Sequence, residues 1–156
     1  MRHMTPHAAL IAIHLLAAAF WVGGMATLQF ALRPAVAVAL QTPPQRLALM
    51  AAVLQRFLLG VTLAIAALFA SGLAMILAGG GFAAQAPGVH AMFGLALVMT
   101  ALFARIRFSL FPRLRAAVAA ADWPAAGAAL ASLRTLVAIN LGLGVLVVLA
   151  AAFGRA

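Results

Sequence analysis

Four histidines are the residues of this chain that carry the most chemistry. His3, His7 and His14 stand in or beside an apolar stretch near the start of the chain, and His90 opens a later one. Imidazole is a ligand for transition metals and for heme iron. An ionisable residue inside an apolar segment is a functional candidate by default, because its burial in the membrane is costly. We therefore predict that His14 and His90, which lie deepest in apolar sequence, bind a metal or a cofactor.

Methionines accompany the histidines, and the combination indicates which metal they would bind. One methionine lies among the N-terminal histidines, and another follows His90 by two residues. Thioether and imidazole groups together suit copper, especially Cu(I). A helix that begins near residue 3 would carry the first three histidines on one stripe, since each residue advances by about 100°. The predicted copper ligands are the core pair His14 and His90 and the more peripheral His3, His7, Met4 and Met92.

Two alternatives use the same histidines differently. His14 and His90 would be the axial ligands of a b-type heme, and the small residues four positions later, Ala18 and Gly94, would leave space beside each ring. The protein would then be a membrane oxidoreductase that uses quinone or porphyrinogen. In the other alternative the histidines only bond to neighbouring carbonyls, and the methionines fill the core.

The elements that must position these residues are membrane helices. Of the 156 residues, 68% are hydrophobic, 7% are charged and none is cysteine, whereas a soluble domain has about a quarter charged residues. A spanning helix takes about 20 apolar residues, and four stretches are apolar without the alternation of a membrane strand. The expected fold is all-α, a polytopic bundle of four transmembrane helices that forms one membrane domain over residues 1–156. The expected spans are about 7–33, 56–78, 88–107 and 134–153, with amphipathic, re-entrant inner-side segments at about 44–55 and 113–133.

The arginines predict the orientation of these spans. The formal charge of +9 comes from ten basic residues, all arginine, which lie in short loops and so do not indicate a nucleic-acid-binding protein. Eight of them fall in or beside loops 1–2 and 3–4, and cytoplasmic loops collect positive charge. The termini and the uncharged loop GGGFAAQAPG should therefore face the periplasm from a bacterial inner membrane, with the histidines in or near the outer half. Four arginines are expected to snorkel to the inner surface, where they would grip anionic lipid heads: Arg33, Arg56, Arg105 and Arg134.

Few features of the chain are typical of an enzyme. Asp122 is the only acidic residue, and its place before Trp123 and Pro124 is typical of a helix N-cap. One carboxylate cannot perform the two-carboxylate chemistry of a glycoside hydrolase, and no Walker, GxSxG or dinucleotide-binding motif is present. Ser71 with Gly72, and the glycines around Asn140, are expected where helices approach closely, with Asn140 donating a hydrogen bond across the bundle.

Several segments taken together resemble a known family. The stretches HLLAAAFWVGGM, RPAV, QRF, SGLAMI, VHAMFGL, DWPAA and LRTLVAINLGLG are similar to the small CopD-like integral membrane proteins of bacteria, over nearly the whole chain. The resemblance implies copper uptake, delivery or resistance, with His14 and His90 as the matched polar positions. The chain departs from larger relatives in having only four spans and in lacking a lysine that they often carry near Met92. A related group, the HemJ-like protoporphyrinogen oxidases, is also a compact bundle with histidines in its spans, so the resemblance leaves heme as an alternative.

The expected partners follow from these hypotheses. They are the lipid bilayer, a copper ion or heme, and either a periplasmic copper donor or a quinone, but not a nucleic acid. The inner half of the bundle has no histidine and offers only methionines such as Met25 and Met50. Binding, sensing or delivery, or transport through a homo-oligomer, therefore fits better than transport through a lone four-helix pore.

Overall fold

The computed structural model describes residues 6–153, which form helices and short connections and contain no strand. The described chain folds into four long rods, two of which are interrupted by a turn of π-helix. In chain order the elements are α1 (Pro6–Thr27), the π-turn η1 (Leu28–Leu32), α2 (Arg33–Ala39), α3 (Pro43–Ala78), the 3₁₀ turn η2 (Phe82–Ala84), α4 (Pro87–Arg105), the π-turn η3 (Ile106–Leu110), α5 (Phe111–Ala119) and α6 (Trp123–Phe153).

Each rod is long and apolar enough to cross a membrane, which confirms the predicted all-α bundle of four spans. The rods cover Pro6–Ala39, Pro43–Ala78, Pro87–Ala119 and Trp123–Ala152, and each exceeds the roughly 20 residues that the hydrocarbon core requires. Large apolar side chains are exposed on their outer faces; Leu16 is 71% exposed and Leu63 is 67% exposed. Such a surface is unfavourable in water and favourable against lipid tails. The segments at about 44–55 and 113–133, predicted to be amphipathic and to lie on the inner side, form the ends of these rods and the turn between α5 and α6.

Helix starts follow the local sequence signals. Helix α3 begins at Pro43, because proline fits the first turn of a helix, where an N–H would have no partner. The side chain of Asp122 accepts a hydrogen bond from the N–H of Ala125 at 3.0 Å, which confirms it as the N-cap of α6. The acid is therefore engaged in capping a helix.

The two π-turns share a cause that is visible in the sequence. Turn η1 is followed by Pro34 and turn η3 by Pro112, each as the second residue after the turn. Proline has no N–H to donate and its ring clashes with the carbonyl four residues earlier, so the helix widens just before it. The two π-turns therefore lie at equivalent places in the first and third rods.

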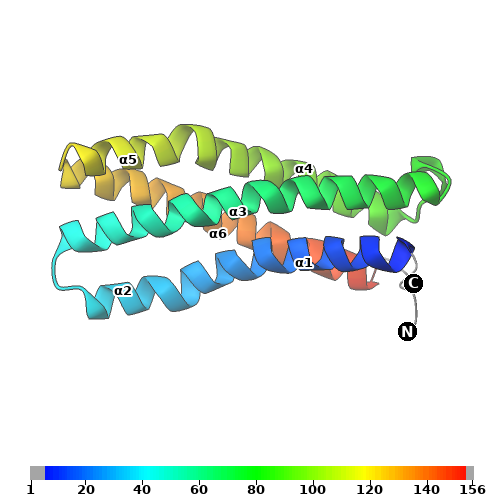
Figure 1. Ribbon diagram of the computed structural model, residues 1–156, viewed down its shortest axis with the longest axis horizontal. Helices are drawn as coiled ribbons and strands as arrows, with labels where there is room; N and C mark the ends of the chain where they lie inside the picture. The colour runs from blue at the N-terminus through cyan, green and yellow to red at the C-terminus, as the bar shows by residue number, and fades with distance from the viewer. Residues whose placement is uncertain (1–5, 154–156) are drawn as a thin grey trace.

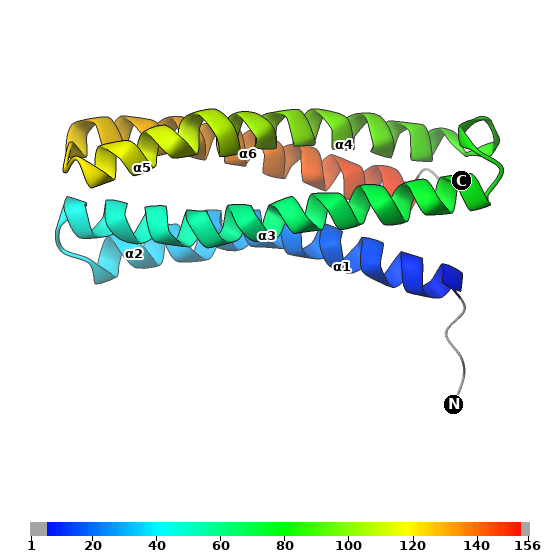
Figure 2. The ribbon, with the colours of Figure 1, turned by 45° about the horizontal axis from the view of Figure 1, so that its top comes forward.

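The rods run in alternating directions and pack as a four-membered bundle (Figure 1). The start of α1, the connection between α3 and α4 and the end of α6 lie at one end, and the turns before α3 and before α6 lie at the other. Helix α1 packs chiefly along α3, and α4 packs along α6. Both views place α1 and α4 on opposite sides of the bundle, with α3 and α6 between them (Figure 2).

Helices α1 and α3 are interlocked by two phenylalanines and two glycines. The ring of Phe57 on α3 fills the space where a Cβ on Gly24 of α1 would lie. Reciprocally, the ring of Phe20 on α1 lies 2.6 Å from the Cβ position of Gly60 on α3. The two rings also contact each other, with centroids 6.0 Å apart. Because each ring requires a glycine opposite it, this Phe–Gly interlock fixes how far α1 is shifted along α3.

The interlock predicts opposite effects for two neighbouring glycines. Gly24→Ala should lower the free energy of unfolding by roughly 1–3 kcal/mol, because the new methyl group forces the Phe57 ring out of its packing. Gly23→Ala, which meets nothing within 4 Å, should be neutral or stabilise by up to about 1 kcal/mol, since alanine favours the helix. Thermal unfolding in detergent, followed by tryptophan fluorescence, compares the variants. Equal stability of the two would show that the interlock does not set the α1–α3 packing.

Candidate functional site

His14 lies on the face of α1 that packs against α3. Its imidazole is half-buried, and its Nδ1 lies 3.0 Å from the hydroxyl of Ser71, which is itself buried. The neighbouring residue, Gly72, leaves room for the ring, because a Cβ there would lie 3.2 Å from Cε1 of His14. The helix contact that was predicted at Ser71 and Gly72 is therefore the place where the His14 side chain packs against α3.

The hydrogen bonds around Ser71 determine which ring nitrogen of His14 carries the proton. The Ser71 hydroxyl donates to the carbonyl of Ala67 at 2.6 Å, and a hydroxyl has only one proton to give. Its oxygen must therefore accept from His14, so Nδ1 is the protonated nitrogen. In the neutral ring the lone pair is then on Nε2.

His90 has the same arrangement of ring nitrogens in a different setting. It lies in the first turn of α4 and is exposed, and its Nδ1 is 3.2 Å from the carbonyl of Ala86. A carbonyl only accepts, so Nδ1 donates here too and the lone pair of the neutral ring is on Nε2. The His90 ring also lies 6.3 Å from the ring of Phe82, which packs edge-on against Phe93 at 5.0 Å.

The structure does not bring the two histidines into contact. His14 is bonded to α3 and His90 to the residue just before α4, and within residues 6–153 no hydrogen bond or ring contact joins them. Helices α1 and α4 are not among the described helix pairs that pack closely, and both views place them on opposite sides of the bundle. A shared site for His14 and His90, which required the first and third spans to touch, remains a prediction without support from the packing.

The peripheral candidates are placed only in part. His7 is exposed in the first turn of α1, and Met92 is half-buried on α4, while His3 and Met4 lie outside the described residues. Within the described part of the chain no three residues among histidine, cysteine, aspartate and glutamate gather in a group that would hold a metal. Any site there must use fewer such ligands, with help from thioethers or from groups outside the described residues.

Two features of the structure were missed from the sequence. One is that Ser71 accepts a hydrogen bond from His14, whereas it was expected only as a small residue at a helix contact. A hydroxyl followed by glycine inside a span could have indicated this contact. The other is that Arg33 and Arg134 line one cavity. Asn140 is buried as expected for a residue between helices, but its Oδ1 has no hydrogen-bond partner among the residues that the structure describes.

Comparison with known proteins gives one match. The family model described as copper resistance protein D, CopD, matches residues 51–153, which is more than half of the chain. The matched region includes Ser71 and His90 and stops short of His14. No match was found among curated proteins or among solved structures.

The hydrogen-bond network predicts the tautomer of His14. In nitrogen-15 NMR spectra of the full chain in detergent, at a pH where the imidazole is neutral, His14 should carry its proton on Nδ1. Ser71→Ala should change the Nδ1 signals because their partner is lost. Ser132→Ala removes an exposed hydroxyl that bonds only to its own helix, at Ala128, and should leave them unchanged. A proton on Nε2 in the wild type would contradict the assignment.

Proposed function

The chain belongs to the copper resistance protein D family, and from that premise we propose that it binds copper ions at the membrane and delivers or takes them up, with His14 as a ligand. Copper is here the cargo of the protein and not a resident cofactor. The observation that carries the proposal is the orientation of His14. Its Nδ1 is committed to Ser71, so its Nε2 presents a lone pair.

This arrangement is typical of a metal-binding histidine. Such residues usually donate the other ring N–H to an oxygen acceptor, which fixes the tautomer and the direction of the ring. Ser71 supplies that acceptor from a neighbouring helix, and its own proton is directed to Ala67, so it cannot compete for the ligand lone pair. Imidazole and thioether ligands suit Cu(I), which accepts low coordination numbers.

We place His14 and His90 at two separate positions for copper, since α1 and α4 do not pack closely in the described part of the bundle. His90 is one turn into α4, about 5 Å from its start, and His14 is about 12 Å along α1 from Pro6. His90 is therefore the shallower position and His14 the deeper one. Met92, His7 and the terminal His3 and Met4 remain proposed partners of these positions.

Heme is the less favoured alternative. A b-type heme with His14 and His90 as axial ligands would need both imidazoles to face one iron from either side. The two rings belong to helices on opposite sides of the bundle, and His14 is already bonded to α3. The packing therefore favours separate copper positions over a shared porphyrin.

The copper proposal predicts a loss of affinity that follows the histidines. The full chain, purified in detergent without metal, is titrated with Cu(I) against a chromophoric chelator under reducing conditions. His14→Ala should weaken copper binding at the His14 position by at least about 100-fold, because it removes a ligand and not only a group that orients one. Ser71→Ala should weaken it by about tenfold, because it removes the group that orients that ligand. Ser132→Ala is the matched control and should bind as the wild type does.

The same preparation separates the alternatives. Independent positions predict that His14→Ala and His90→Ala each remove part of the bound copper and that the double variant removes the sum. A His14→Ala protein with wild-type affinity would refute the role of His14. A Soret band in the visible spectrum of the purified wild type, absent from both histidine variants, would show that the two histidines bind heme, and the copper proposal would be wrong.

We also propose that the protein lies in a bacterial inner membrane with both termini in the periplasm. In the structure the start of α1, the end of α6 and the uncharged connection between α3 and α4 share one end of the bundle. Most arginines belong to the other end, which the positive-inside rule places in the cytoplasm.

The orientation predicts where a fused reporter is active. Alkaline phosphatase joined after Ala156 should be active, because that enzyme needs the oxidising periplasm to form its disulfides. Its fusion within the turn before α3, after Gln41, should be inactive. The reverse result would show that the bundle has the opposite orientation in the membrane, with the histidines on the cytoplasmic side.

A further inference from the structure

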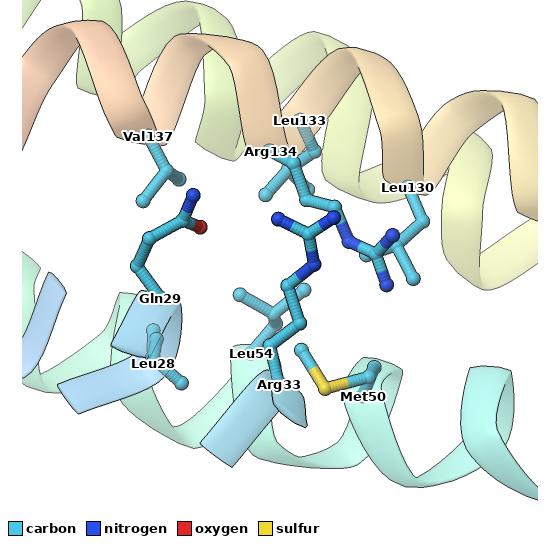
Figure 3. Close-up of a pocket in the computed structure, with 9 residues that line it drawn as sticks. All are labelled: Leu28, Gln29, Arg33, Met50, Leu54, Leu130, Leu133, Arg134 and Val137. Atoms are coloured by element: carbon cyan, nitrogen blue, oxygen red, sulfur yellow. The ribbon is translucent and has the colours of Figure 1, made fainter. Parts of the chain in front are cut away.

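A small cavity between α6 and the first rod is lined by two arginines. Arg33, the first residue of α2, and Arg134 of α6 direct their guanidinium groups into the same space, and Gln29 of η1 lies beside them (Figure 3). The cavity has a volume of about 20 Å³, and its remaining walls are apolar side chains such as Leu54 and Leu133. Two cations therefore face each other in an otherwise apolar surrounding.

These two cations have no counter-charge within the chain. Asp122 is the only acidic residue, it caps α6, and it lies about 18 Å along that helix from Arg134. Within residues 6–153 the Nε atom of Arg134 is buried without a hydrogen-bond partner, and the Arg33 guanidinium is close enough to repel that of Arg134. Arg33 is exposed and Arg134 is half-buried, so the two cations are open to the surroundings of the bundle. Like charges that lie close together, one of them with a buried donor that has no partner, favour binding of an anion from outside the chain.

The depth of Arg134 indicates what surrounds it. It precedes the end of α6, Phe153, by 19 residues, which is about 29 Å along the helix. The hydrocarbon core of a bilayer is about 30 Å thick. With the end of α6 at one boundary of the hydrocarbon core, Arg134 therefore lies at the opposite boundary, where an arginine side chain reaches the lipid phosphates.

Guanidinium groups and the size of the cavity select the chemistry of the partner. The planar fork of arginine binds phosphate through paired hydrogen bonds, and the amide of Gln29 offers further donors. A volume of about 20 Å³ holds one or two oxygen atoms and excludes a whole metabolite. The ligand must therefore present a compact anionic group and keep the rest of its mass outside the cavity.

We propose that Arg33, Arg134 and Gln29 form a binding site for a phosphate group, which is supplied by the headgroup of an anionic lipid or by free phosphate. The anion neutralises both arginines and joins the first rod to α6. The site is separate from the proposed copper positions, and its loss should not change copper affinity.

The test compares the thermal stability of the full chain in a neutral detergent after addition of different phosphate-containing compounds. Phosphatidylglycerol, phosphatidylcholine or inorganic phosphate is added, with sodium chloride at matched ionic strength as the control for screening. Phosphatidylglycerol should raise the Tm of the wild type by several degrees and phosphatidylcholine should not. A rise with inorganic phosphate as well identifies free phosphate as a ligand, whereas a rise with phosphatidylglycerol alone identifies the lipid headgroup.

Charge-neutral variants assign the effect to the cavity. Arg33→Gln combined with Arg134→Gln should abolish the rise, and Arg56→Gln, which removes an exposed arginine outside the cavity, should retain it. If the double variant does not fold, Arg33→Gln alone should raise the anion concentration needed for half of the effect by about tenfold. The proposal is overturned if neither anion raises the Tm, or if the cavity variant responds as Arg56→Gln does.

Discussion

The interlock of Phe20 and Phe57 with two glycines is the interaction on which the rest of the structure depends. Between helices in lipid there is little hydrophobic driving force, so association relies on close packing at small residues. The interlock supplies that packing and allows one longitudinal position of α1 against α3. In that position His14 meets Ser71, and the orientation of its imidazole follows. The orientation of His14 thus follows from a steric constraint located more than a helical turn away from it.

The polar groups of the bundle separate into two kinds. At one end, hydroxyl and carbonyl oxygens accept hydrogen bonds from Nδ1 of His14 and of His90, which leaves a lone pair on Nε2 of each neutral ring. Toward the other end, Arg33 and Arg134 converge without an acid to balance them. The first arrangement suits a soft cation and the second an anion. Because the single acidic side chain of the chain caps a helix, it is not available to balance the two arginines.

The features that could be predicted from the sequence are those that depend on neighbouring residues. Continuous apolar stretches predicted the four spans, and Asp122 before a tryptophan and a proline predicted an N-cap. The pairing of His14 with Ser71 could not be predicted, because it depends on the shift of α1 along α3, and glycines are too frequent in the chain to identify the two that matter. The placement of α1 and α4 on opposite sides of the bundle could not be predicted either, because helical periodicity does not specify the order in which four rods pack around a bundle.

The central claim is that packing of α1 on α3 directs Nε2 of His14 toward a copper ion. X-ray absorption at the copper edge, on the His90→Ala chain loaded with one equivalent of Cu(I), reports the ligands of the His14 position most directly. The account predicts imidazole nitrogen in the coordination shell, which decreases when His14→Ala is added and is retained when Ser132→Ala is added. A spectrum that is the same with and without His14→Ala would contradict it.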